Sequence, residues 1–387
     1  LAKLAAPVWA GLASAMRASS IRSSGQGESL PRTERDIPIW IVGATILGSL
    51  VPLAVLFHSF LSAGPLESML APLIVGGVLY VVVAGFLVAA VCGYMAGLIG
   101  SSNSPVSGLA ILSVLGAALL LVALAAKTVG PTGHAALVAY ALFVTAVLLN
   151  VATIANDNLQ DLKTGQLVDA TPWKQQVALI IGVVAGACVI PPILDVLNKA
   201  FGFAGAANLD TISDQPLAAP QAVLISTLAK GVIQGDLPWT YIGVGAVLGL
   251  ALVVIDELLR RTGKYSLPPL GVGIAIYLPA AVTLPVVIGA VIGWTYDRWA
   301  AKKPNGAAAQ RMGVLLASGF IVGESLFNVA LAGFIVATNN PSPIAVAPAS
   351  FPEQFMWAGA GVFALIVLGL YLWTELKSRD FLLIEAD

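Results

Sequence analysis

The sequence is poor in charged residues. Only 10% of its 387 residues are Asp, Glu, Lys or Arg, whereas a soluble globular domain carries about 25%. So few charges cannot cover a water-facing surface, and the composition therefore excludes a soluble enzyme. Nineteen basic residues against twenty acidic ones leave a net charge of −1, which gives no basic surface for nucleic acid. We expect no nucleic-acid partner.

Histidine and cysteine are also scarce, with two of each. These numbers are too small for a zinc cage or a disulfide scaffold, and both Cys92 and Cys188 lie inside apolar runs. We expect no cofactor and no protein-held metal, and we interpret the chain as not an enzyme. His58 and His134 have no partner at a spacing typical of an intramembrane catalytic site.

The sequence is instead rich in long apolar runs. It contains 58% hydrophobic residues and has a mean hydropathy of +0.92. A bilayer core about 30 Å thick needs roughly 20 apolar residues per helix. Most of the tryptophans lie near the ends of these runs, where an aromatic belt would place them. The sequence predicts an all-α, polytopic transmembrane helix bundle. Its clear spans are 38–60, 70–98, 106–127, 135–155, 175–197, 239–259, 312–337 and 354–374.

Two further apolar segments are irregular. The stretch 217–233 is short, and the stretch 267–296 is long and rich in proline. Basic residues favour the cytoplasmic side of a membrane protein. If the basic segment before residue 37 is cytoplasmic, the later basic clusters reach the same side only when both irregular segments are re-entrant or cross an even number of times. The clusters concerned are Arg260, Arg261 and Lys264, and then Arg298, Lys302, Lys303 and Arg311.

We therefore predict three parts of the chain: a cytoplasmic amphipathic and linker segment over 1–36, a transmembrane domain over 37–376 and a cytoplasmic C-terminal tail over 377–387. The bilayer is one expected partner. The chain begins with Leu1 rather than Met, and the linker-like start favours further helices of the same protein before it. Homo-oligomer formation stays open.

The proline-rich segment predicts a broken helix. Pro279 removes a backbone donor and clashes with the carbonyl four residues earlier, so the helix should open around 275–279. Freed carbonyls in a membrane are tolerated where they are buried in protein or line a cavity, and discontinuous helices form transporter binding sites. We predict a substrate site at Tyr277, Pro279 and Thr283. The alternative is a simple proline kink.

A second candidate is the small, polar loop 100–108, which joins two spans. Its amides and hydroxyls, from Ser101, Ser102, Asn103 and Ser104, could hold a carboxylate at a helix N-terminus. The alternative is a plain helix cap, with Ser104 as N-cap before Pro105.

Polar residues inside spans are the third kind of candidate. Glu324 is the one formal charge near the middle of a predicted span, with Asn328 on the same helix face. An intramembrane carboxylate should pair, face water or be protonated, so we predict proton coupling by Glu324 and Asn328. The alternative is a helix-packing hydrogen bond. Asn150, inside another span, is a predicted substrate contact.

Two polar clusters have simpler interpretations. The segment 156–165 follows a span directly and is interpreted as a solvated cytoplasmic turn. Asp256 and Glu257 precede Arg260 and Arg261 at helical spacing, which predicts an interfacial ion-pair cluster.

Four stretches together resemble the oligopeptide transporter family, in its bacterial and yellow-stripe-like branch. They are residues 96–108, 157–165, 273–279 and 317–326. The resemblance implies a secondary active transporter in the cell (inner) membrane that carries small oligopeptides or metal-chelate complexes with protons. It also implies more helices than this chain holds, so the chain resembles the C-terminal portion of such a protein.

Two other functions remain open at this point: a channel or uniporter, and a non-autonomous half-transporter subunit. An intramembrane enzyme would need a nucleophile–base pair or a metal cluster within the spans, and the sequence shows neither. A channel would also use broken helices, but it could not concentrate its substrate. Since no His/Cys cluster exists to bind a bare ion, any metal substrate would arrive already chelated.

Overall fold

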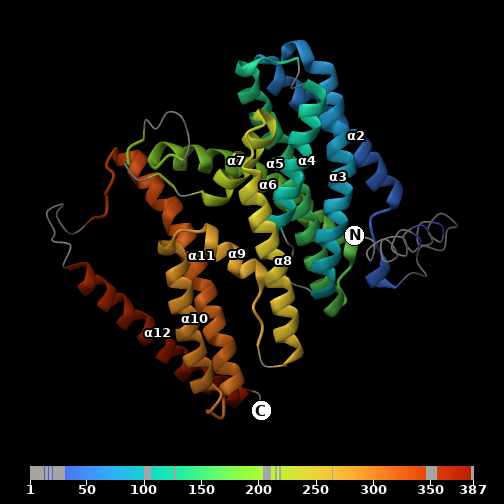
Figure 1. Ribbon diagram of the computed structural model, residues 1–387. Coiled ribbons are helices and arrows are strands. Elements are labelled where there is room, and N and C mark those ends of the chain that lie inside the picture. Colours follow the sequence, from blue (N-terminus) through green and yellow to red (C-terminus); the bar gives the residue numbers. More distant parts are fainter. Residues whose placement is uncertain are drawn as a thin grey trace. The chain divides into compact units, whose positions relative to one another are not determined.

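The computed structural model describes residues 31–99, 106–125, 128–203, 211–213, 216–217, 219–263, 265–345 and 355–384, together with residues 13, 16 and 20 (Figure 1). Over these ranges the chain is almost entirely helical, and the pairing of Phe203 with Leu217 is an isolated β-bridge. The all-α fold predicted from the sequence is confirmed.

Eight helices in the described part of the chain are long and apolar enough to cross a bilayer, one for each predicted clear span. Each has at least the roughly 20 residues that a bilayer core requires. They are α2 (Ile39–Ser62), α3 (Leu70–Ile99), α4 (Val106–Ala125), α5 (Pro131–Leu167), α6 (Pro172–Ala200), α8 (Trp239–Arg261), α11 (Gly306–Thr338) and α12 (Met356–Ile384).

The two irregular segments form shorter helices. The first is α7 (Pro220–Gln234), whose 15 residues span only about 22 Å and which ends at Gly235 in the left-handed conformation (φ 75°). The second is divided into α9 (Pro269–Tyr277) and α10 (Ala280–Ala300). Short 3₁₀ turns, η2 (Arg32–Glu34) and η3 (Glu67–Met69), precede α2 and α3.

The chain forms two compact units. The first contains residues Leu1–Ile190 and Ala219–Trp239, and the second contains Pro191–Ala218 and Thr240–Asp387. One boundary falls at Pro191, inside α6, where two consecutive prolines lack backbone donors. We describe each unit by itself.

The first unit is built on the packing of α3, α4, α5 and α7, with α2 against α3. The buried face of α4 carries mainly small residues at helical spacing, including Ala110, Ser113, Ala117 and Ala118. Small side chains let helix backbones approach closely, which is how helices associate in lipid without a hydrophobic driving force. The short helix α7 packs on α4 and α5 and contributes Ala229 and Ile233 to the same core.

The second unit contains α8, α9, α10, α11 and α12, and α11 packs against both α10 and α12. Ala332 and Ile335 of α11 are buried with Ala200, the last residue of α6. Many large apolar side chains on these helices are exposed, as expected where lipid is the solvent.

One sequence interpretation is wrong. The segment 156–165 was interpreted as a solvated turn, but α5 continues through it to Leu167. No proline interrupts this stretch, and its Gln, Leu and Lys residues are good helix formers, so the polar composition does not end the helix.

Candidate functional site

The helix break in the second unit lies where the sequence predicts it. α9 ends at Tyr277, Leu278 and Pro279 are not helical, and α10 begins at Ala280. Pro279 has φ −57° and ψ 145°, which is extended backbone, and its carbonyl accepts the amide of Thr283 at 3.2 Å. Pro285 lies inside α10 without ending it. Pro279 therefore marks the break, whereas Pro285 shows that a proline in this segment does not by itself end the helix.

Two helix ends of opposite polarity meet at this break. The last carbonyls of α9 and the first amides of α10 have no partner within their own helices. The C-terminus of a helix carries partial negative charge and the N-terminus carries partial positive charge. Pro279, as N-cap of α10, provides no side-chain hydrogen bond to those amides. The break thus presents donors and acceptors to whatever lies beside it.

The three residues predicted at the break differ in their exposure. Pro279 is exposed and Thr283 is half-buried. The hydroxyl of Thr283 lies 3.5 Å from the carbonyl oxygen of Ala280, at the limit of a hydrogen bond. Tyr277 is the last residue of α9, but its side chain lies outside the described part of the structure.

Glu324 and Asn328 lie on α11, both exposed on the second unit. Neither side chain has a hydrogen-bond or ion-pair partner among the described residues. The helix-packing hydrogen bond considered for Glu324 is therefore not formed in this part of the structure.

The register of α10 and α11 places Glu324 at the level of the break. The Tyr296 hydroxyl of α10 donates to the carbonyl oxygen of Ala309 on α11 at 3.0 Å, which fixes the antiparallel pair near its turn (Figure 1). Roughly 20 Å of helix axis separates Thr283 from that point along α10, and about the same length separates Glu324 from it along α11. The carboxylate and the opened backbone thus share one depth in the second unit.

Buried polar contacts hold the turn between α10 and α11 against α12. The Tyr296 hydroxyl lies 3.4 Å from the Thr374 hydroxyl, Asn305 donates to Ser378, and the ammonium of Lys303 lies 3.8 Å from a Glu375 carboxylate oxygen. Sequence reasoning missed this cluster. Its members lie in α10, in the turn after α10 and in α12, about 70 residues further along the chain, and only packing brings them together.

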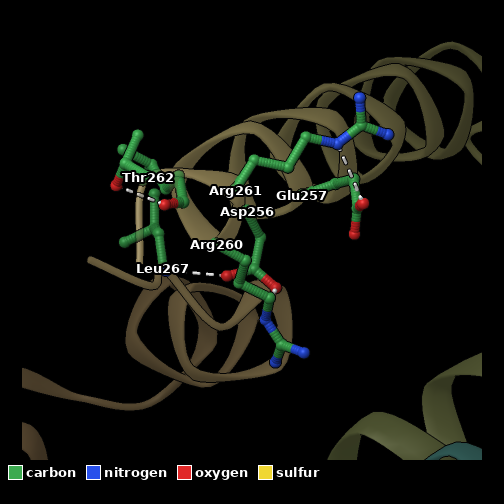
Figure 2. Close-up of polar contacts among 7 residues, drawn as sticks. Asp256, Glu257, Arg260, Arg261, Thr262 and Leu267 are labelled. Atoms are coloured by element: carbon green, nitrogen blue, oxygen red, sulfur yellow. Dashed lines mark hydrogen bonds and ion pairs between the residues drawn. The ribbon is translucent and has the colours of Figure 1, made fainter. Parts of the chain in front are cut away.

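At the end of α8 the predicted ion-pair cluster is confirmed (Figure 2). Arg260 lies 3.0 Å from Asp256, and Arg261 lies 3.3 Å from Glu257. Asp256 also accepts the backbone amide of Leu267 at 2.8 Å, which the spacing of charges along the sequence does not indicate.

In the first unit, the start of α4, which follows the predicted polar loop in the sequence, lies next to the start of α7. Ser101, Ser102, Asn103 and Ser104 lie outside the described residues. Immediately after them, the Ser107 hydroxyl at the start of α4 accepts a hydrogen bond from the Gln221 amide at the start of α7, at 2.7 Å. Two partly positive helix N-termini therefore lie side by side, an arrangement suited to a carboxylate.

Asn150 gives a simpler result. Its side-chain amide donates to the carbonyl oxygen of Ala146, one turn earlier on α5, at 2.9 Å, and the residue is exposed. In the first unit it is a side chain bonded to its own helix. In the second unit, Pro279 and Thr283 thus lie at the break and Glu324 lies at a similar depth along α11, whereas Asn150 belongs to the first unit.

The start of α6 contacts both the polar end of α5 and the segment before α2. The Gln175 amide donates to the Asp161 carbonyl at 3.0 Å, and the Gln176 amide donates to the Asp36 carboxylate at 3.0 Å. A hollow of about 260 Å³ here is lined by Asp36, Lys163 and seven other residues. The described residues contain no group of three His, Cys, Asp or Glu side chains placed to hold a metal ion.

Comparison with known proteins gives the family. The model of the OPT oligopeptide transporter protein family matches residues 3–335. A Haemophilus influenzae protein named "Putative oligopeptide transporter" is 41% identical over 89% of this chain and 56% of its own length. "Probable metal-nicotianamine transporter YSL5" of Arabidopsis thaliana is 26% identical over 50% of this chain and 27% of its own length.

The chain spans about half the length of the bacterial relative and about a quarter of the length of the plant relative. No solved structure matches the chain significantly.

Proposed function

The chain belongs to the OPT oligopeptide transporter family, and from that premise we propose that it is the membrane part of a secondary active transporter for small oligopeptides or metal chelates. Its relatives are named as transporters of these two substrate classes. Both substrates are small and carry carboxylates together with amino groups, so the same polar groups can serve either. Protons are the proposed coupling ion.

The observation that carries the proposal is the break between α9 and α10 at the depth of Glu324. The partly positive start of α10 suits a substrate carboxylate, and the partly negative end of α9 suits a substrate amino group. Discontinuous helices at mid-membrane form the binding sites of many secondary transporters. Pro279 and Thr283 are the described side chains we assign to substrate contact, and Tyr277 is assigned from its position at the end of α9.

Glu324 is the proposed proton acceptor. A carboxylate in the middle of an apolar helix is unfavourable by at least about 2.5 kcal/mol on insertion scales, so it is retained in such places for function. It is exposed on its unit and has no protein partner among the described residues, so no ion pair within the described part of the chain competes with the proton-accepting role proposed for it. Asn328, one turn away, is assigned to the same pathway.

In the first unit, we assign the loop with Ser101, Ser102, Asn103 and Ser104 to substrate carboxylate binding. The support is the hydrogen bond between Gln221 and Ser107, which joins the start of α7 to the start of α4, the helix that follows this loop in the sequence. Asn150 is also assigned to substrate contact from its place inside a span, although its amide is bonded to its own helix.

We place the protein in the cell (inner) membrane, with both terminal segments on the cytoplasmic side. The distribution of basic residues supports this orientation, since α8 and α10 both carry arginine in their last turn. The 15 residues of α7 are too few for a full crossing, in keeping with a re-entrant segment between α6 and α8.

The test is transport in liposomes by the chain, alone and joined to any N-terminal region of its full-length protein. Uptake of a labelled tripeptide and of an iron chelate is measured with and without an inward proton gradient. Gradient-dependent accumulation of either substrate is the expected result, and it names the substrate class. Equilibration that ignores the gradient contradicts coupling and favours a channel or uniporter. Flux only with the N-terminal region present identifies a half-transporter.

A further inference from the structure

Two ion pairs at the end of α8 look alike in sequence and differ in structure. Asp256 and Glu257 each pair with the arginine four residues later, at 3.0 and 3.3 Å. The side chain of Asp256 is only 12% exposed, whereas that of Glu257 is 61% exposed. Figure 2 shows the two carboxylates pointing in different directions from the helix. Exposed pairs of this kind contribute little to stability, so burial singles out Asp256.

Asp256 uses its two oxygens for different partners. Oδ2 pairs with the Arg260 guanidinium, and Oδ1 accepts the backbone amide of Leu267 at 2.8 Å (Figure 2). A hydrogen bond to a charged acceptor is about twice as strong as one between neutral groups. The Arg260 pair holds the carboxylate in the orientation that the Leu267 amide needs.

Leu267 occupies a special place in the chain. Helix α8 ends at Arg261, the chain turns at Gly263 in the left-handed conformation (φ 68°), and α9 begins at Pro269. Pro268 and Pro269 have no N–H groups. The amide of Leu267 is therefore the last backbone donor before the first turn of α9, and Asp256 binds it.

We propose that Asp256 is a positioning residue that sets where α9 starts relative to α8, and through α9 sets the position of the backbone opened at Leu278–Pro279. Helix α9 has nine residues and is only about 13 Å long, so displacing its start displaces its far end by a similar amount. The effect on transport rests on the proposed function, which places substrate at that break. The effect on the position of α9 does not depend on the proposed function.

The chain supplies matched variants for the test. Asp256→Ala removes both contacts, Asp256→Asn keeps an oxygen for the Leu267 amide but removes the charge, and Arg260→Gln removes only the ion pair. Glu257→Ala is the control, because it removes an equivalent charge on the same turn without any contact to the segment before α9. The full-length protein is used throughout, in liposomes.

Two measurements are made on each variant. Hydrogen exchange of the amides over residues 265–277 reports the anchoring of α9, and initial uptake rates give KM and the maximal rate for whichever probe the wild type accumulates. We expect Asp256→Ala to speed exchange in this segment and to raise KM by roughly tenfold, with the maximal rate nearly unchanged. Asp256→Asn should show an exchange rate and a KM close to those of the wild type, and Glu257→Ala should match the wild type in both.

Unchanged exchange in Asp256→Ala overturns the proposal, as does an identical effect of Glu257→Ala. Faster exchange with an unchanged KM overturns the link to the substrate site while leaving the anchor in place. If the wild type takes up neither probe, the proposed function fails, and the exchange measurement still decides whether Asp256 positions α9.

Discussion

Tyr140 of α5 donates its hydroxyl to the carbonyl oxygen of Leu73 on α3, 3.0 Å away. Gly77, one turn further along α3, leaves the space that the tyrosine occupies, because a Cβ there would collide with the hydroxyl. Because Gly77 has no side chain, the carbonyl oxygen of Leu73 one turn earlier stays accessible to the tyrosine. A buried tyrosine hydroxyl needs such a hydrogen-bond partner. The ring is fully buried and contacts Phe57 edge-on.

The same arrangement occurs twice more. Tyr80 of α3 donates to Ser113 of α4 beside Gly116, and Tyr296 of α10 donates to Ala309 of α11 beside Gly313. Close backbone approach at small residues and hydrogen bonds between helices are the forces available for helix association in lipid. Three helix pairs are thus joined in the same way, by a tyrosine hydroxyl that donates to a backbone carbonyl beside a glycine.

Replacing Gly77 should weaken the first unit. Gly77→Ala places a methyl group against the Tyr140 hydroxyl in a packed core, and overpacking of this kind typically costs about 1–3 kcal/mol. Thermal unfolding in detergent micelles measures the loss. Gly48→Ala on α2 is the control, since its Cβ would meet no atom within 4 Å and should be neutral or slightly stabilising. Equal effects of the two changes would contradict the assigned role of Gly77.

The pair of Tyr296 and Gly313 should behave as one unit in the second half of the chain. Gly313→Ala puts a Cβ 2.6 Å from the tyrosine ring, so it should destabilise the protein by about 1–3 kcal/mol. In a Tyr296→Ala background the same change should be almost neutral, because the colliding ring is gone. A double-mutant cycle on unfolding midpoints measures this coupling, and additive effects would count against it.

Pro279 and Pro285 should differ in their effect on transport. Pro279→Ala restores an amide and allows α9 and α10 to join as one helix, which should lower uptake by roughly tenfold or more through lost geometry. Pro285→Ala, inside α10, should leave uptake close to the wild-type rate because no break exists there. Liposome uptake of both variants provides the comparison, and a reversed order would remove the break from the substrate site.

Glu324→Gln should separate transport from coupling. The amide cannot take up a proton, so accumulation against a gradient should be lost while exchange of labelled for unlabelled substrate continues. Both are measured in the same liposomes, with Glu257→Gln as an exposed carboxylate control. Accumulation that survives the change would show that another group carries the proton.

Much of the fold is predictable from hydropathy alone. Spans must be apolar and about 20 residues long, and all eight clear spans have a matching helix. The break is also predictable, because proline acts locally on the residues before it. The prediction of an opening over 275–279 is met at Leu278 and Pro279.

Contacts between distant residues are where sequence reasoning fails. The polar composition of 156–165 suggested a turn, but helix propensity and packing extend α5 to Leu167. The spacing of charges predicts an ion-pair cluster that contains Asp256 and Arg260, yet the bond from Asp256 to Leu267 depends on how the chain folds back after Gly263. The spacing of Tyr296 and Gly313 in sequence likewise gives no sign of their contact.

Helix α5 has a further consequence because of its length. Its 37 residues extend about 55 Å, while the hydrocarbon core is about 30 Å thick and helix tilt rarely exceeds 40°. Its polar end therefore lies outside the hydrocarbon core, packed against the start of α6, with Leu167 at the end of the helix 78% exposed. A single reactive thiol introduced there, with Cys92 and Cys188 replaced, would act as a sidedness reporter: an impermeant label reaches it from one compartment only.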